Sequence, residues 1–293
     1  MKCKICSSEN IKVIYNDYIR NGEVGKITDQ KYKMYQCDNC GVIWHDVIPD
    51  SNKEYYESEK YRKELENSAD IESYYKIHDT EVLEKLNYTG TNIFRHKRVA
   101  DVGCGGGSFL DFISGVASEV IAIEPSNIYR MGLEKKGYLV TDYSANAVKK
   151  GIEADVVTSF DVIEHVDDPI SFLRDIYDLL KKDGTAIVGT PTDAPLLRKF
   201  IGHEYEQFLF SYQHPWVLSA RAFKLACVKA GFNNVIIEQK QRYGLTNAMM
   251  WLRDKKPCGH IQADIISGTL EELFKKCCEE QQSADYIVAY LKK

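Results

Sequence analysis

Residues 98–112 read RVADVGCGGGSFLDF, and this stretch decides the fold. A short β-branched run ends at Val102, glycines follow at positions 103, 105 and 107, and an apolar helical pattern begins at Ser108. Glycine lets the backbone come close to a ligand, and free N–H groups at the start of a helix can point at that ligand. The stretch therefore predicts a strand, a ligand-binding turn and a helix in that order.

The alternation of predicted strands and helices continues along the chain. Short β-branched runs predict strands at 98–102, 120–124, 138–140, 155–159, 185–189 and 235–238, with an alternating closing strand at 286–291. Helices are predicted at 108–113, 128–136, 170–180 and 220–230, with Gly137, Gly184 and Gly231 as helix-ending glycines. Strands that alternate with helices indicate βαβ units. We therefore predict an α/β fold, with a Rossmann-like, doubly wound and mostly parallel sheet of seven strands.

The glycine spacing and two carboxylates narrow the ligand class. The pattern Gly103-x-Gly105-x-Gly107 differs from the G-x-G-x-x-G of dinucleotide-binding proteins, and Asp101 stands just before its first glycine. This favours a ligand without a pyrophosphate. About twenty residues later, the second strand ends at Glu124, whose carboxylate can accept hydrogen bonds from both hydroxyls of a ribose.

These residues resemble the first two motifs of class I S-adenosylmethionine methyltransferases, and the resemblance extends from about residue 100 to residue 231. It implies that the glycine-rich turn binds the methionine part of the cofactor and that residues 141–143 lie near the adenine. Residues 158–166, TSFDVIEHV, resemble the F-D-x-x-E-H motif of a subgroup that includes the ubiquinone-biosynthesis O-methyltransferases. The cofactor-binding residues that the resemblance implies are Asp101, Gly103, Cys104, Gly105, Gly107, Glu124, Pro125, Asp142, Tyr143, Phe160 and Asp161. A dehydrogenase or a plain nucleotide-binding domain is the alternative.

Two histidines are candidates for the reaction itself. His165 follows Glu164 at the carboxyl end of the fourth strand, and His214 lies in the loop FSYQHPW after the fifth. Imidazole titrates near neutral pH, so either side chain is suited to act as a general base or to orient the acceptor. The alternative is a packing role beneath the cofactor or in the loop. His203 is a weaker candidate.

Four cysteines near the N-terminus form two C-x-x-C pairs, Cys3 with Cys6 and Cys37 with Cys40. Four thiolates at this spacing can surround one tetrahedral Zn²⁺ and leave no open coordination position, which predicts a structural ion in a zinc ribbon over residues 1–48. Free or transiently oxidised cysteines are the alternative.

The remaining segments are assigned by their patterns. Residues 49–92 are charged and aromatic with apolar residues at helical spacing, and they predict a helical connector. The domain from 93 to 293 contains a predicted helical insertion at about 243–282, which is a candidate contact in a homo-oligomer. Tyrosines of the connector either pack on the domain or form an aromatic lid, namely Tyr55, Tyr56, Tyr61, Tyr74 and Tyr75.

A four-cysteine module ahead of this methyltransferase pattern resembles sugar C-methyltransferases that act on nucleotide-linked deoxysugars. The resemblance implies a small acceptor, a sugar or nucleotide-sugar hydroxyl or carbon, and S-adenosylmethionine and Zn²⁺ as cofactors. Two alternatives stay open. One is an RNA-modifying methyltransferase that uses the zinc module to recognise RNA, and the other is a non-catalytic scaffold that has kept the fold.

Composition limits the partners of the chain. A net charge of -5 over 293 residues argues against a protein that binds nucleic acid mainly through phosphate neutralisation. No run of residues approaches the roughly 20 apolar residues that span a bilayer. The N-terminus shows no apolar core of signal-peptide length, so we expect a cytoplasmic protein without a membrane contact.

Overall fold

The computed structural model describes residues 1–22, 25–45 and 71–293. The chain folds into two compact units, each of which is made of segments that are separated in the sequence. Unit 1 contains Met1–Ile48, Gly189–Leu225 and Ile237–Val288, and unit 2 contains Pro49–Val188, Ala226–Ile236 and Ala289–Lys293. The predicted domain boundaries at residues 48 and 92 stay predictions. Tyr55, Tyr56 and Tyr61 lie outside the described residues.

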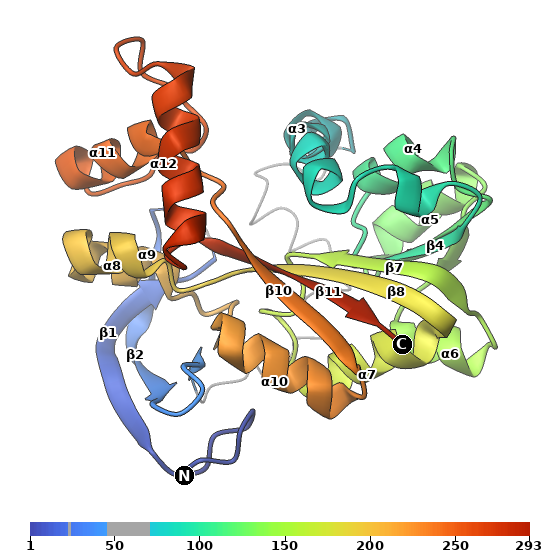
Figure 1. Cartoon of the computed structure of the whole chain (residues 1–293), viewed down its shortest axis with the longest axis horizontal. Helices are drawn as coiled ribbons and strands as arrows, with labels where there is room; N and C mark the ends of the chain where they lie inside the picture. The colour runs from blue at the N-terminus through green and yellow to red at the C-terminus, as the bar shows by residue number, and fades with distance from the viewer. Residues whose placement is uncertain (23–24, 46–70) are drawn as a thin grey trace. The chain divides into compact units, whose positions relative to one another are not determined.

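Unit 2 contains parallel strands that are connected by helices, as the βαβ pattern of the sequence predicts. Strand β4 (Arg98–Val102) pairs in parallel with β5 (Glu119–Ile123) on one side and with β7 (Ala154–Phe160) on the other, and β5 pairs with β6 (Leu139–Thr141). Strands β8 (Leu180–Pro191), β10 (Asn234–Lys240) and β11 (Tyr286–Lys292) complete the order β10-β11-β8-β7-β4-β5-β6 (Figure 1). The predicted mostly parallel sheet of seven strands is confirmed.

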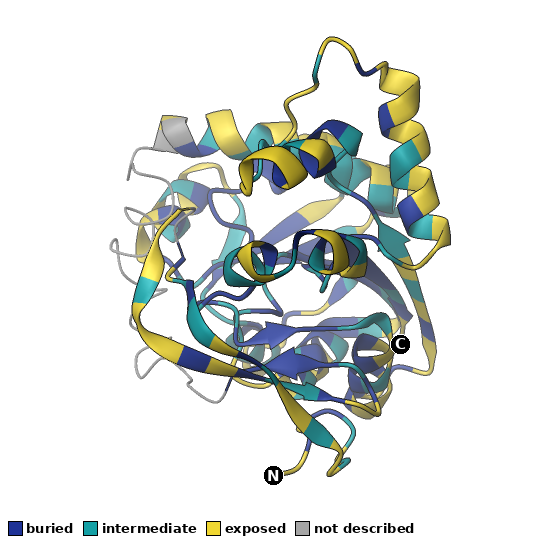
Figure 2. Cartoon of the chain, turned by 90° about the vertical axis from the view of Figure 1, so that its left-hand side faces the viewer, coloured by how far each residue is buried: buried dark blue, intermediate teal, exposed yellow. Residues whose placement is uncertain are grey.

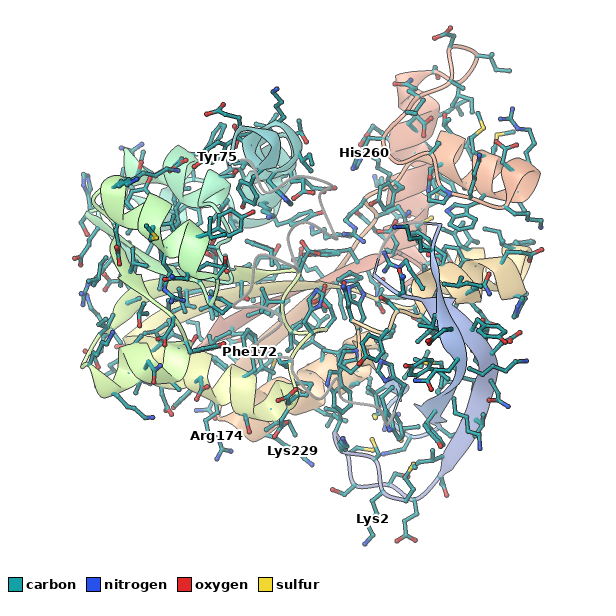
Figure 3. All side chains as sticks on the ribbon, turned by 180° about the vertical axis from the view of Figure 1, so that it is seen from behind. Lys2, Tyr75, Phe172, Arg174, Lys229 and His260 are labelled. Atoms are coloured by element: carbon teal, nitrogen blue, oxygen red, sulfur yellow. The ribbon has the colours of Figure 1, made fainter. Side chains whose placement is uncertain are left out.

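The central strands are buried, and Figure 2 shows them mostly in dark blue. Parallel strands covered on both faces tend to be continuous apolar runs, as residues 120–123 of β5 are, whereas the run of β4 is interrupted by the buried Asp101. Helices in the sequence of unit 2 are α3 (Ile71–Thr89), η1 (Asn92–Phe94), α4 (Ser108–Ser114), α5 (Asn127–Lys135), α6 (Ser144–Lys149) and α7 (Pro169–Leu179). Helix α10 (Ala220–Ala230) begins in unit 1 and ends in unit 2. Within unit 2, Arg174 of α7 donates a hydrogen bond to the carbonyl oxygen of Lys229 of α10 at 3.0 Å (Figure 3).

The predicted role of Gly184 is wrong. Helix α7 ends at Leu179 because Leu180 already has an extended backbone and begins β8. Gly184 lies inside that strand, and the left-handed position belongs to Asp183, with φ at 62°. A Cβ on Gly184 would lie 2.9 Å from the carbonyl oxygen of Lys181. Close approach of the backbone, and not a helix end, therefore explains this glycine.

Unit 1 contains a second, four-stranded sheet. Its order is β1 (Ile11–Arg20), β2 (Ile27–Cys37), β3 (Ile43–Trp44) and β9 (Trp216–Val217). The pairs β1–β2, β2–β3 and β3–β9 are antiparallel, and Trp44 lies opposite Trp216. The last strand comes from a position more than 170 residues further along the chain than β3. The N-terminal segment predicted as a separate module thus shares its sheet with a strand from the middle of the sequence.

The helices of unit 1 are α8 (Pro195–Ile201), α9 (His203–Leu209), α11 (Leu245–Asp254) and α12 (Gly268–Glu280). The last two lie in the segment 243–282 that the sequence predicts to be helical. Of the helices in the described ranges, none is long and apolar enough to pass through a bilayer.

Candidate functional site

The glycine-rich turn follows β4 as predicted. Gly103, Gly105 and Gly107 have φ values of 77°, 56° and 89°, which side chains rarely tolerate. The N–H groups of Gly103 and Cys104 donate to the carbonyl oxygen of Ile123 at 2.8 and 3.3 Å, which holds the turn against the end of β5. The turn leads directly into α4, so its backbone is bent as a ligand cradle requires.

At each of these three positions, a neighbouring side chain also leaves no room for a Cβ atom. A Cβ on Gly103 would lie 2.3 Å from Cγ2 of Val162, and one on Gly105 would lie 2.5 Å from the hydroxyl of Tyr74. On Gly107 it would lie 2.6 Å from a side-chain methyl of Leu133. All three distances are below those of real van der Waals contacts, so side chains here would displace the turn.

Glu124 connects the second strand to the glycine-rich turn. Its carboxylate is buried and accepts hydrogen bonds from the backbone N–H groups of Gly105 and Ser126, both at 2.8 Å. A carboxylate can accept about four hydrogen bonds. The two backbone bonds are therefore compatible with this group also accepting the hydroxyls of a ribose. The neighbouring Pro125 accepts a hydrogen bond from Arg130 at its carbonyl oxygen.

Asp101, just before the turn, and Cys104, within it, are both buried. Burial raises the pKa of Asp101 to about 6; a hydrogen bond from the hydroxyl of Thr158 at 2.7 Å and the charge of Lys85 act against this shift, and Glu124 reinforces it. Burial, with the carboxylates of Glu124 and Asp101, also holds the pKa of the Cys104 thiol well above its usual value. A raised pKa at a carboxyl next to the glycine-rich turn is the kind of perturbation that functional sites show.

Helix α3 contributes contacts to the turn that the sequence did not predict in detail. The hydroxyl of Tyr74 lies 3.4 Å from the carbonyl oxygen of Cys104, and that of Tyr75 lies 3.2 Å from the carbonyl oxygen of Gly106. Tyr75 is labelled on α3 in Figure 3. Lys85, nearly three turns further along this helix, has its ammonium 5.8 Å from the ring centroid of Phe160. Tyr74 and Tyr75 thus contact the glycine-rich turn. Helical periodicity in the sequence does not distinguish between packing and an aromatic lid for these residues.

The third and fourth strands end in the other predicted cofactor residues. The carboxylate of Asp142 accepts hydrogen bonds from the N–H of Tyr143 at 3.0 Å and from the amide of Asn146 at 2.9 Å. Burial raises the pKa of Asp142, but these bonds outweigh it and the pKa is lowered. At the end of β7, Phe160 is buried and Asp161 has a left-handed backbone, with φ at 58°. Such strain in a residue other than glycine is found most often at functional sites.

The two candidate catalytic histidines belong to different units. His165, in unit 2, is half-buried, and its N–H donates to the carbonyl oxygen of Val162 at 2.9 Å. His214, in unit 1, is also half-buried, and its N–H donates to the carbonyl oxygen of Ser211 at 3.0 Å. Both bonds are made by backbone N–H groups, so a short turn within each unit holds the backbone of its histidine.

His203 has contacts that match a packing role. Its ring stacks on Tyr15 with the centroids 5.4 Å apart, and its Nε2 lies 3.6 Å from Asp17. All three residues belong to unit 1. The weaker sequence candidate is thus packed on the surface of β1.

The four N-terminal cysteines come together in unit 1. The sulfurs of Cys3 and Cys40 are 3.6 Å apart and those of Cys6 and Cys37 are 3.5 Å apart, and all four lie within 4.8 Å of one another. Zn–S bonds of about 2.3 Å in a tetrahedron place sulfurs about 3.8 Å apart. The donor set therefore fits a closed zinc site. Ser219, near the start of α10, donates a hydrogen bond to the carbonyl oxygen of Cys40 at 2.6 Å.

Comparison with known proteins points to one family. A family model described as a methyltransferase domain matches residues 74–237, which is more than half of the chain. Curated relatives are named ubiquinone biosynthesis O-methyltransferase: one from Ruegeria pomeroyi is 36% identical over 105 residues, 33% of this chain and 42% of its own length. Another, from Stutzerimonas stutzeri, is 31% identical over 168 residues, 53% of this chain and 72% of its own length. For the Ruegeria relative and one from Dinoroseobacter shibae, the chain spans about half of the relative's length, 42% and 54%.

A solved structure shows the same fold. The crystal structure of a SAM-dependent methyltransferase from Archaeoglobus fulgidus aligns with a TM-score of 0.52 at 18% identity. The alignment covers 76% of this chain and 98% of that protein. At this identity the likeness concerns the fold alone.

Proposed function

The chain belongs to the family of proteins with a methyltransferase domain, and from this premise we propose that it transfers the methyl group of S-adenosylmethionine to a small acceptor. The observation that supports this most is the buried Glu124 carboxylate bonded to the N–H of Gly105 in the glycine-rich turn. One group thereby links the part of the site suited to an amino acid to the part suited to a ribose. The expected second product is S-adenosylhomocysteine.

Several residues have proposed roles in cofactor binding. The turn from Gly103 to Gly107 would hold the methionine part, Glu124 the ribose hydroxyls, and the segment of Asp142 and Tyr143 the adenine. The sulfonium supplies an electrophilic methyl group, so the protein mainly has to place the acceptor in line with it. Phe160 would line this region and exclude water.

We propose that a histidine handles the proton of the acceptor. A hydroxyl is a weak nucleophile at neutral pH, and a general base raises the rate of its reaction. His165 and His214 are the two candidates. Substitution of each by glutamine, with a comparison of kcat and S-adenosylmethionine affinity, separates a base from a packing residue.

The proposed acceptor is a sugar or nucleotide-sugar hydroxyl or carbon. Its support is the four-cysteine module in front of the methyltransferase pattern, which resembles the organisation of nucleotide-sugar C-methyltransferases. A second candidate is the hydroxyl of an aromatic ring, which the name of the curated relatives favours.

We further propose a structural Zn²⁺ at Cys3, Cys6, Cys37 and Cys40, on the basis of their sulfur distances. All nine cysteines are free of disulfides, which is typical of a reducing compartment and supports a cytoplasmic protein. The proposed contact in a homo-oligomer is the exposed apolar surface of α11 and α12, which includes Met249, Leu252 and Leu273.

The test of the proposed function combines binding with turnover. Calorimetry measures S-adenosylmethionine affinity for the wild type, for Glu124→Ala and for the control Glu119→Gln, which changes an exposed carboxylate at the other end of the same strand. We expect Glu124→Ala to weaken binding and Glu119→Gln to leave it unchanged. Release of S-adenosylhomocysteine is then measured with a nucleotide-sugar, a catechol and an RNA as acceptors. Absence of S-adenosylmethionine binding by the folded wild type would refute the proposal.

A further inference from the structure

Arg20, the last residue of β1, has its backbone held on both sides within unit 1. Its N–H donates to the carbonyl oxygen of Phe210 at 3.0 Å, and its carbonyl oxygen accepts from the N–H of Tyr212 at 2.9 Å. The guanidinium carbon lies 5.1 Å from the ring centroid of Phe208 on α9. The side chain is therefore directed at the aromatic residues of this helix.

The guanidinium of Arg20 has no acidic partner in the described ranges. Its Nε is buried and makes no hydrogen bond to a described residue. Two other arginines of unit 1, whose Nε atoms are likewise buried without a hydrogen bond, do have an acidic partner. Arg198 lies 2.7 Å from the carboxylate of Glu206, and Arg242 lies 3.6 Å from that of Asp285. Arg20 thus carries a charge that neither of these carboxylates neutralises.

The charge persists at neutral pH. Burial lowers the pKa of Arg20 to about 10, while Tyr243 and Tyr205 act in the opposite direction. A pKa of this value keeps the guanidinium protonated in nearly every molecule at pH 7. Arg20 as a whole is half-buried, and its Nε is buried. A cation that has lost much of its hydration and has no described carboxylate beside it is a candidate binding site for an anion.

Aromatic residues lie near this cation: Phe208 contacts the guanidinium, and Tyr205 and Tyr243 are close enough to affect its pKa. Phe208 lies 5.0 Å from Trp251, and Tyr205 lies 5.1 Å from the same ring. Tyr243 lies 4.9 Å from His260, which is labelled in Figure 3. Tyr205 and Trp251 are buried, while Phe208 and Tyr243 are only half-buried. Partly accessible rings of this kind can stack against a planar base.

We propose that Arg20 binds a phosphoryl group of a nucleoside diphosphate and that the neighbouring rings contact its nucleoside. The planar guanidinium matches phosphate oxygens and can bind two of them at once. The hydroxyls of Tyr205 and Tyr243 are further donors in its surroundings. This inference rests on the proposed function, because the diphosphate would belong to the nucleotide-sugar that accepts the methyl group.

The experiment measures binding of UDP and TDP to the full-length protein by calorimetry. We expect both to bind the wild type and Arg20→Met to bind them at least about 10-fold more weakly, because a charge-assisted hydrogen bond to the phosphate is lost. Arg20→Lys keeps the charge without the planar fork and should show an intermediate loss. The matched control is Arg221→Gln, which removes an exposed arginine of the same unit.

Thermal unfolding without ligand separates this role from a structural one. A ligand-binding Arg20 predicts that Arg20→Met melts at or above the temperature of the wild type, because the substitution removes a half-buried charge that no described carboxylate neutralises. A clearly lower melting temperature would indicate a structural arginine and would overturn the proposal. Failure of UDP and TDP to bind the wild type, or equal binding by wild type and Arg20→Met, would do the same.

Inorganic pyrophosphate and S-adenosylmethionine complete the design. Pyrophosphate that binds as tightly as UDP would refute a nucleoside-containing ligand, since the rings would then contribute nothing. Titration with S-adenosylmethionine reports separately on the proposed methyl transfer. If the cofactor binds and the nucleoside diphosphates do not, only the inference about Arg20 fails; if the cofactor does not bind, the proposed function fails.

Discussion

The buried carboxyl of Asp101 predicts an unusual dependence of stability on pH. Its pKa is about 6 in the folded protein, while the ordinary value is 3.8. The folded state therefore binds this proton more tightly than the unfolded state does. The contribution of the group to stability is fully present below pH 4 and is lost as the pH rises through 6. The difference between the two pKa values corresponds to about 3 kcal/mol.

The substitution Asp101→Asn removes this titration. Urea unfolding of wild type and variant between pH 4 and pH 8 gives the free energy of unfolding of each. The neutral amide carries no desolvation penalty for a charge, so the variant should gain on the wild type with rising pH. We expect the difference between the two proteins to grow by about 2.5 kcal/mol from pH 4 to pH 7 and then to stay nearly constant.

A second carboxyl provides a control of opposite sign. Burial raises the pKa of Asp155, but the hydrogen bond from the backbone N–H of Arg98 and the ammonium of Lys181 lower it by more. The resulting pKa is below the usual value. The stability that this carboxylate contributes is already present above its ordinary pKa of 3.8 and is lost only at lower pH, so the difference between wild type and Asp155→Asn should stay nearly constant between pH 4 and pH 8. A pH-independent difference between wild type and Asp101→Asn would refute the reasoning about the buried carboxyl.

Three further predictions concern the turn, the cysteines and the base. Gly107→Ala should lower the free energy of unfolding by about 1–3 kcal/mol through overpacking and a disfavoured φ, whereas Gly115→Ala, with open space around it, should change it little; equal unfolding curves would contradict the first expectation. Metal analysis should find one zinc per chain in the wild type and a loss in Cys37→Ser but not in the control Cys104→Ser, and a wild type without zinc would exclude the metal site. His165→Gln should lower kcat by about 10²-fold or more with unchanged S-adenosylmethionine affinity if it is the base, and an unaltered kcat would assign it to packing.

The sequence alone predicts the elements whose local residue pattern also matches their burial in the core. Strand β4 was predicted at 98–102 and occupies Arg98–Val102, and β5 differs from its prediction by one residue at each end. A buried parallel strand needs mostly apolar residues, and a glycine-rich turn needs glycines at positive φ. Both features therefore depend on residues that are adjacent in the sequence. The four cysteines were likewise brought together as their spacing predicted.

Tertiary structure decided what depends on residues far apart in the chain. Gly184 was assigned to a helix end because its surroundings resemble one, yet the carbonyl oxygen of Lys181 and the path of β8 determine its place. Strand β9 joins β3 across more than 170 residues, which a search for local patterns does not detect. Among the described residues, the lack of a carboxylate beside Arg20 cannot be recognised from the sequence either, because charge neutralisation depends on which side chains meet after folding and not on which residues are neighbours along the chain.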